Sequence, residues 1–217
     1  MKKILYFLVI ILFFSQDSYS QEYTFDNYYE YNSDNGTKFF MTNSGNENYL
    51  FFGYTGNQTI YGYIVDFNSN EYHYFDVENT NDSVSFTYTY SKKITECLCD
   101  IEEKNVTYTY SVESIDSLKS KTIVNKIKIK KNGKIKPIAK LELSYQNDET
   151  YIFYPSHLNF YLHHFHITNE LIGIKNKLPL KIDVFYNNER TFTSSLSKRK
   201  KINTLLTISK EQIKYSE

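Results

Sequence analysis

The segment Val106-Thr-Tyr108-Thr-Tyr110-Ser-Val112 places a large apolar side chain at every second position and a hydroxyl side chain between them. Val84-Ser-Phe86-Thr-Tyr88-Thr-Tyr90 has the same pattern earlier in the chain. Successive side chains of a β-strand point to opposite faces of a sheet, so each segment covers a core with one face and contacts water with the other. This division is typical of antiparallel sheets. The two segments therefore predict a mainly β fold.

Further alternating segments predict strands along most of the chain. They are Tyr28–Tyr31, Lys38–Met41, Tyr49–Tyr54, Thr59–Phe67, Glu71–Val77, Ile94–Ile101, Ile138–Tyr145, Leu180–Tyr186, Thr191–Ser195 and Ile202–Ile208. The composition agrees, because 22 Tyr and 16 Phe stand beside only 7 Gly and 3 Pro, and aromatic residues are enriched in strands. We therefore expect one antiparallel sheet of many strands.

Two turn signals predict how neighbouring strands pair. Asn68-Ser-Asn70 lies between two strand segments and predicts a hairpin. Around Asn132-Gly133, a two-residue loop would mix apolar and charged side chains on both faces, whereas a three-residue loop places Ile129 opposite Ile135. We predict the three-residue loop, with Gly133 in the left-handed conformation. Pro137 then belongs at an edge or a bulge, because proline cannot donate to the ladder.

The apolar period changes after Pro155-Ser156. Apolar residues then recur at helical spacing, with Ser156 as the N-cap and Gly173 as the stop: Leu158, Tyr161, Leu162 and Phe165. This spacing predicts a helix over residues 156–172. Ser114–Leu118 is a second candidate, for a short helical turn.

The first residues have the pattern of a secretory signal peptide. Lys2 and Lys3 precede the apolar run Ile4–Phe14, and Ser18-Tyr-Ser20 offers small residues at the positions that a signal peptidase needs. The run is too short to cross a bilayer, which takes about 20 residues, and no later segment is longer. We therefore expect a signal peptide over residues 1–20 and one β-rich domain over 21–217, exported to the periplasm or secreted and soluble, without a transmembrane segment.

Charge is distributed unevenly, although the formal net charge is +0. Acidic residues prevail up to Leu118 and basic residues prevail after it, with the densest basic run at Lys198–Lys201. A basic surface for an anionic partner is one interpretation, and complementary charges on neighbouring strands are the other. The run Lys198–Lys201 is expected in a solvated loop between two strands. Export argues against nucleic acid as a partner.

Histidine and cysteine provide the only clustered candidates for metal or redox chemistry. His163 and His166 share one side of the predicted helix, whereas His164 and His166 would share one face of a strand, and either pair could begin a zinc or copper site. The alternative is that they are polar residues flanking an amphipathic helix. Cys97-Leu-Cys99 could form a strained disulfide, pair with another chain or remain as thiols.

Signatures of catalysis are missing from the sequence. It contains no Gly-x-Ser-x-Gly, no His-Glu-x-x-His and no phosphate-binding glycine loop. Ser156 adjoins His157, but its role as a helix cap accounts for it. We therefore predict no catalytic residue, no cofactor and no bound metal, and expect that the protein is not an enzyme.

The C-terminal part resembles a known family. Lys177-Leu-Pro179-Leu-Lys-Ile-Asp-Val-Phe-Tyr186, a short turn, Thr191–Ser195, a basic link and Ile202–Ile208 are similar to the closing strands of periplasmic lipoprotein-carrier-like proteins. The resemblance implies a strongly curved antiparallel sheet that wraps around helices and holds acyl chains in an apolar cavity. The chain as a whole also resembles secreted, Tyr-rich proteins of Bacteroidetes-type bacteria.

These observations give one expectation for the fold and three for the function. The fold is expected to be mainly β, of the α+β type, with a strongly curved antiparallel sheet or open half-barrel and one or two short helices. The first function is non-catalytic binding or carriage of an apolar or lipid-like ligand in the periplasm or cell envelope. The second is a structural or interaction protein that binds an envelope protein or a polymer through its sheet faces. The third is a metal-dependent enzyme.

Overall fold

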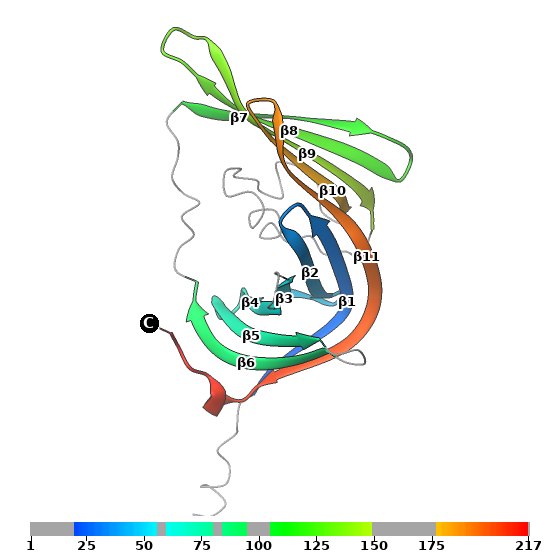
Figure 1. Ribbon diagram of the computed structural model, residues 1–217, viewed down its shortest axis with the longest axis vertical. Helices are drawn as coiled ribbons and strands as arrows, with labels where there is room; N and C mark the ends of the chain where they lie inside the picture. Colours follow the sequence, from blue (N-terminus) through cyan, green and yellow to red (C-terminus); the bar gives the residue numbers. More distant parts are fainter. Residues whose placement is uncertain (1–19, 56–59, 80–83, 95–104, 149–176, 217) are drawn as a thin grey trace, which may run out of the picture.

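One antiparallel sheet makes up the fold. The structure, a computed structural model, describes residues 20–55, 60–79, 84–94, 105–148 and 177–216. Eleven strands pair in the order β6-β5-β4-β3-β2-β1-β11-β10-β9-β8-β7 (Figure 1). They are β1 (Gln21–Ser33), β2 (Gly36–Asn43), β3 (Asn46–Thr55), β4 (Ile60–Asp66), β5 (Glu71–Asn79), β6 (Val84–Lys93), β7 (Val106–Ser114), β8 (Lys119–Ile129), β9 (Ile135–Asn147), β10 (Lys177–Tyr186) and β11 (Glu189–Ile208). The predicted antiparallel β fold is confirmed, and the sheet is open, with β6 and β7 at its edges.

The longest strand, β11, joins two meanders. Glu189–Ser195 pairs with β10, and Ser194–Ile208 pairs with β1. Figure 1 shows β11 bending along its length, and two register shifts against β1 accompany the bend. The prediction of two strands separated by a basic loop was therefore wrong. Lys198–Lys201 lies within β11, paired with Asn27–Glu30 of β1.

A row of aromatic side chains crosses β1 to β6 on one face of the sheet, which we call the aromatic face. Each member pairs directly with the next across neighbouring strands: Tyr29, Phe40, Phe52, Tyr63, Tyr74 and Tyr90. Ring centroids are 5.2 Å apart for Phe40 and Phe52 and 4.5 Å apart for Tyr74 and Tyr90. Aromatic pairs of this kind stabilise a sheet beyond their burial alone. Exposure rises along the row from 0% at Tyr29 to 37% at Tyr90.

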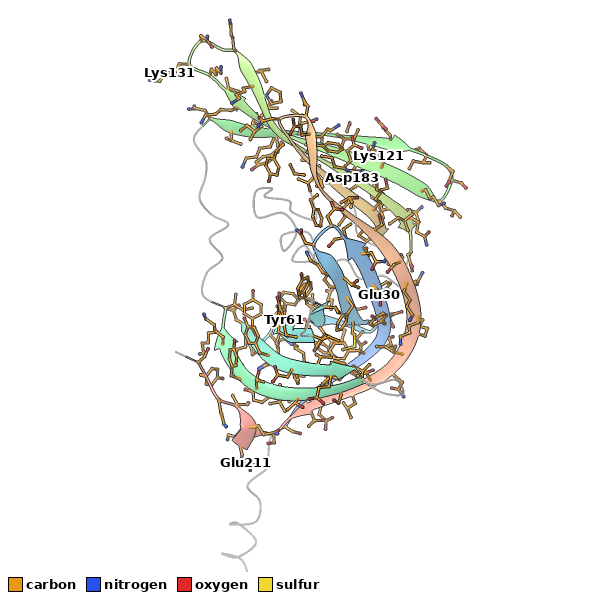
Figure 2. The ribbon with its side chains drawn as sticks, viewed as in Figure 1. Glu30, Tyr61, Lys121, Lys131, Asp183 and Glu211 are labelled. Atoms are coloured by element: carbon orange, nitrogen blue, oxygen red, sulfur yellow. The ribbon has the colours of Figure 1, made fainter. Side chains whose placement is uncertain are left out.

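The aromatic face continues as an aliphatic core over β8 to β10. Val124, Leu141 and Val184 are buried there, in register across three strands. The opposite face of these strands is polar and carries ion pairs from Lys121 and Lys140 to Glu142, at 2.7 and 2.8 Å. Figure 2 marks Lys121 on this part of the sheet. This half therefore has the division into one apolar and one polar face that the sequence predicts.

Over β1 to β6 the opposite face is apolar as well, and we call it the groove face. Its buried cluster joins the ends of β1 and β11 to β2, β3, β4 and β5: Tyr23, Phe25, Phe39, Met41, Tyr49, Phe51, Ile64, Phe75, Val77, Leu206 and Ile208. Phe25 lies 5.5 Å from Tyr49 and 6.3 Å from Phe51, measured between ring centroids. Two apolar faces require cover on both sides, and the ends of β1 and β11 supply part of it on the groove face.

Both predicted turns are confirmed. β4 and β5 form a hairpin with Asn70 at φ 58°. Ile129 pairs with Ile135, and Gly133 has φ 75°, as the three-residue loop requires. Pro137 lies beside a register shift between β8 and β9, in agreement with its expected place at a bulge.

Helical structure differs from the prediction within the described residues. Ser114–Leu118 forms a hairpin turn and not a helical turn, because Asp116 Oδ1 accepts hydrogen bonds from the N–H groups of Leu118 and Lys119, both at 2.8 Å. The helix predicted over residues 156–172 lies outside the described residues. Those residues contain one 3₁₀ turn, Lys210–Gln212, and no helix of theirs is long and apolar enough to span a membrane.

Candidate functional site

A groove of about 530 Å³ lies on the groove face. Strands β1 to β6 and the second half of β11 contribute its lining, which includes Met41, Val77, Phe86, Ile202 and Leu205. Residues that lie about 160 positions apart in the chain, such as Met41 and Leu205, come together because β1 pairs with both β2 and β11. The groove is therefore a product of the sheet order and not of one local motif.

Two glycines lie beneath the stacked rings of Phe39 and Phe51. Gly53 and Gly62 pair directly across β3 and β4. A Cβ added at Gly53 would lie 2.0 Å from Phe39 Cζ, and one at Gly62 would lie 2.4 Å from Phe51 Cζ. The two rings stack with centroids 5.8 Å apart and an interplanar angle of 19°. Absence of a side chain at both glycines lets the rings lie directly over the backbone.

Tyr28, Glu30 and Lys200 form the polar end of the groove lining. The Tyr28 ring stacks on Phe39 at 5.6 Å, and its hydroxyl donates a 2.7 Å hydrogen bond to Glu30 Oε2. Burial, together with this hydrogen bond, raises the pKa of Tyr28. Lys200 Nζ lies 5.0 Å from the centre of the Tyr28 ring. Figure 2 shows Glu30 on β1, beside β11.

Lys200 is the cation available for a ligand at this end. Its side chain is exposed, and within the part of the chain that the structure describes no carboxylate forms an ion pair with it. Its neighbour Arg199 points elsewhere, with a 2.6 Å ion pair to Asp148. The lining therefore combines apolar and polar side chains with an end that carries one cation, Lys200, and one carboxylate, Glu30.

A buried polar cluster lies at the other end of β5 and β6. His73 Nδ1 and Ser91 Oγ are 2.7 Å apart, and Tyr88 Oη lies 2.8 Å from the same Ser91 oxygen. His73 Nε2 lies 3.9 Å from a carboxylate oxygen of Glu71. Burial lowers the pKa of His73, so the imidazole is neutral at pH 7.

The C-terminal tail closes this cluster. Tyr215 Oη donates a 2.7 Å hydrogen bond to Glu71, and the carbonyl of Lys214 accepts one from Ser91 N–H at 2.7 Å. A serine hydroxyl that is hydrogen-bonded to a histidine is the first requirement of a nucleophilic site. Here His73 and Ser91 are both 0% exposed, so a substrate cannot reach the hydroxyl. The cluster therefore fastens the tail to β6.

The site residues predicted from sequence lie outside the described residues. These are the candidates His163, His164 and His166 for a metal, and Cys97 and Cys99 for a disulfide. Ser156 and His157, for which no catalytic role was predicted, lie outside them as well. Among the residues that are described, no group of three or more His, Cys, Asp and Glu could hold a metal ion.

Sequence reasoning predicted none of the residues that line the groove or form the His73 cluster. Glycines inside two strands, at Gly53 and Gly62, were an available signal for the close packing of aromatic rings on this face, because an isolated glycine in a strand marks a close approach. His73 stands alone in the sequence, and nothing local connects it with Ser91.

Comparison with protein-family models gives no match to this chain. No curated protein is significantly similar to it in sequence.

Proposed function

We propose that this protein is an exported, non-catalytic binding or carrier protein for an apolar or lipid-like ligand of the periplasm or cell envelope. The groove beside β11 carries the proposal. Its volume, about 530 Å³, falls in the range of roughly 300–1,000 Å³ that is usual for small-molecule sites. Apolar side chains dominate such sites, with a few polar groups that orient the ligand.

We further propose that β1 to β6 and the end of β11 act as the open half-barrel that the family resemblance implies. The apolar groove face supports this, since the cluster formed by Tyr23, Phe25 and Leu206 with Phe51 requires the strand ends to pack across the face. In this arrangement the ligand replaces water on the exposed part of that face. Its apolar chain lies against Phe86 and Leu205, and its polar end lies near Lys200.

Binding of cis-parinaric acid, a fluorescent fatty acid, tests the groove directly. Thr55, in the groove lining, offers a blocking variant, because the indole of Thr55→Trp would occupy space that the ligand needs. Thr55→Val has nearly the same shape as threonine and is the matched control. We expect Thr55→Trp to lose at least tenfold in affinity and Thr55→Val to bind as the wild type does.

The polar end has its own test. Lys200→Met should weaken binding of the free acid about threefold to tenfold and leave binding of its methyl ester unchanged, because only the acid carries a charge for Lys200 to meet. The carrier proposal is wrong if purified protein binds neither probe and carries no extra mass in native mass spectrometry that disappears on denaturation.

An interaction protein of the envelope is the second candidate, and the exposed end of the aromatic face favours it. Tyr61 and Tyr90 are 46% and 37% exposed, and Figure 2 shows Tyr61 among the side chains of this region. Tyrosine provides large contact areas at a low entropic cost. Loss of envelope association in a Tyr61→Ser/Tyr90→Ser variant, with fatty-acid binding unchanged, would favour this function over carriage.

The metal-dependent enzyme stays a third possibility from the sequence alone, through His163, His164 and His166. A native mass that exceeds the bare chain by one zinc or copper ion would support it.

A further inference from the structure

The two edges of the sheet are protected to very different degrees. At β6, the extra residue Thr89 interrupts the register with β5, and Lys92 and Lys93 follow at the end of the strand. The tail also pairs with this edge, because Ser216 N–H donates to the carbonyl of Ser91 at 3.1 Å and Ser91 forms a parallel bridge with Tyr215. Bulges, lysines and covering segments are the usual means of preventing edge pairing.

Among the residues that the structure describes, the β7 edge has none of these devices. Its nine residues, VTYTYSVES, contain no proline and no lysine, and Glu113 is the only charged residue. The pairing with β8 runs without a register shift from Val106 to Ser114. Within the described residues, β7 has a neighbour on one side only. An edge of this length and regularity is a template for another strand.

Hydrogen bonds at both ends of β7 show which backbone groups face outward. Ile129 N–H donates to the carbonyl of Asn105 at 2.9 Å, and Ile115 N–H donates to the carbonyl of Lys119 at 3.0 Å. In an antiparallel pair, such bonds come from every second residue. Odd-numbered residues therefore point their backbone groups toward β8. The N–H and C=O groups of the even-numbered residues of β7, such as Tyr108 and Tyr110, point toward the open edge.

The side chains of β7 are arranged symmetrically about Thr109. Val106 to Val112 reads V-T-Y-T-Y-S-V, so the order of residue types is nearly the same in both directions. When two such strands pair antiparallel about Thr109, Val106 lies opposite Val112 and Tyr108 lies opposite Tyr110. The other face pairs only hydroxyl side chains. Like charges do not meet, because Glu113 lies outside the paired segment.

The exposed side chains also favour this pairing. Tyr110 and Val112 are both 56% exposed, although they continue the rows of the aromatic face that are buried on β8. A second sheet in register would extend these rows and cover both residues. We propose that the protein forms a two-fold symmetric dimer in which β7 pairs antiparallel with β7 of a second copy, centred on Thr109. The two eleven-stranded sheets then form one continuous sheet.

Cysteine cross-linking tests the pairing and its register. In a Cys97→Ser/Cys99→Ser background, Thr109→Cys places two thiols opposite each other at a non-hydrogen-bonded pair, with Cα atoms about 4.5 Å apart, within reach of a disulfide. Thr107→Cys is the matched control, because its two copies would lie about 13 Å apart, four strand residues from each other. We expect Thr109→Cys to give a disulfide-linked dimer under mild oxidation and Thr107→Cys to stay monomeric on a denaturing gel.

Sedimentation velocity of the mature chain provides the second readout. Tyr110→Pro removes one outward donor without affecting the odd-numbered bonds to β8, and should raise the dimer dissociation constant at least tenfold. Tyr110→Thr keeps the donor and should weaken the dimer less, and circular dichroism checks that both variants fold. A monomer at every soluble concentration, equal cross-linking at positions 107 and 109, or a dimer unaffected by Tyr110→Pro would each overturn the proposal.

Discussion

Replacing Gly53 by alanine tests how Phe39, a residue of the groove lining, packs on the sheet beneath it. The new methyl group would lie 2.0 Å from Phe39 Cζ and 2.3 Å from Phe39 Cε1. Ordinary contacts between carbon atoms are about 3.5–4.0 Å long, so the Phe39 ring would have to move away by more than about 1 Å. Phe39 cannot move freely, because it is 7% exposed and stacks between Tyr28 and Phe51. The substitution therefore creates overpacking in a rigid place.

The expected cost follows from the contacts that are lost. Overpacking of a core costs about 1–3 kcal/mol, and each disturbed aromatic pair adds about 0.5–1.5 kcal/mol. Alanine also stabilises the folded state by roughly 0.5–1 kcal/mol relative to glycine, because it reduces the backbone entropy of the unfolded chain. We expect Gly53→Ala to lower the free energy of unfolding by about 2–3 kcal/mol. Urea unfolding followed by circular dichroism measures it.

Two further variants decide whether the ring contact is the cause. Gly45→Ala is the matched control, because its Cβ would come no closer than 3.4 Å to Asn43 Oδ1, and we expect a change within about 0.5 kcal/mol. In a Phe39→Val background the obstacle is gone, so Gly53→Ala should be almost neutral there. An equal cost in both backgrounds would refute the reasoning, because the double-mutant cycle would then show no coupling.

Three other predictions concern polar side chains that are buried or that donate a hydrogen bond to a buried partner. Lys38→Met should raise the free energy of unfolding at pH 7 by about 1–3 kcal/mol, because burial lowers the pKa of Lys38 from 10.5 to about 8 and so makes its charged form costly in the folded state. The stability of the wild type should rise between pH 8 and 10.5, whereas that of the variant should not. A variant less stable than the wild type at pH 7 would contradict this reasoning. Burial lowers the pKa of His73 in the folded state, so its contribution to the free energy of unfolding is complete above the ordinary pKa of 6.5 and is lost as the pH falls through the folded-state pKa. Urea unfolding between pH 7.5 and 5 should therefore show declining stability, with a flatter profile in His73→Asn; equal slopes would argue against His73. Tyr215→Phe should lower the free energy of unfolding by about 1 kcal/mol, because it removes the hydrogen bond to Glu71, and should speed hydrogen exchange at Ser91 N–H. Unchanged exchange at Ser91 would mean that the tail stays paired with β6 without this bond.

The sequence predicts local pairing well where turn chemistry and side-chain pattern agree. At Asn132-Gly133 the loop length followed from requiring Ile129 and Ile135 on one face, and the structure has that register. The same reasoning failed for Tyr90. Alternation places it beside Phe86 and Tyr88, but Thr89 is an extra residue that turns Tyr90 to the aromatic face. A one-residue bulge moves every later side chain of the strand to the opposite face of the sheet, and the alternating pattern does not indicate where such a bulge occurs.

The long-range features of the fold could not be predicted from the sequence, for physical reasons. Lys198–Lys201 interrupts the apolar alternation of β11 and is therefore typical of a loop, yet it pairs with β1 and keeps its charged ends in water, with Lys200 over the Tyr28 ring. The groove depends on β11 lying beside β1, and alternation alone does not reveal which strands are neighbours. Nor does it show that both faces of β1 to β6 are apolar, since that depends on the ends of β1 and β11 packing over one of them.

The pairing of β1 with β11 also determines when the fold can be completed. β1 starts at Gln21, directly after the expected leader, and its first residue pairs with Ile208 near the other end of the chain. The first strand to be synthesised therefore keeps one side unpaired until almost the whole polypeptide has followed. Synthesis and completion of the fold are thus ordered in time. The six-strand meander can form early, but the groove comes into existence only with the arrival of the last strand.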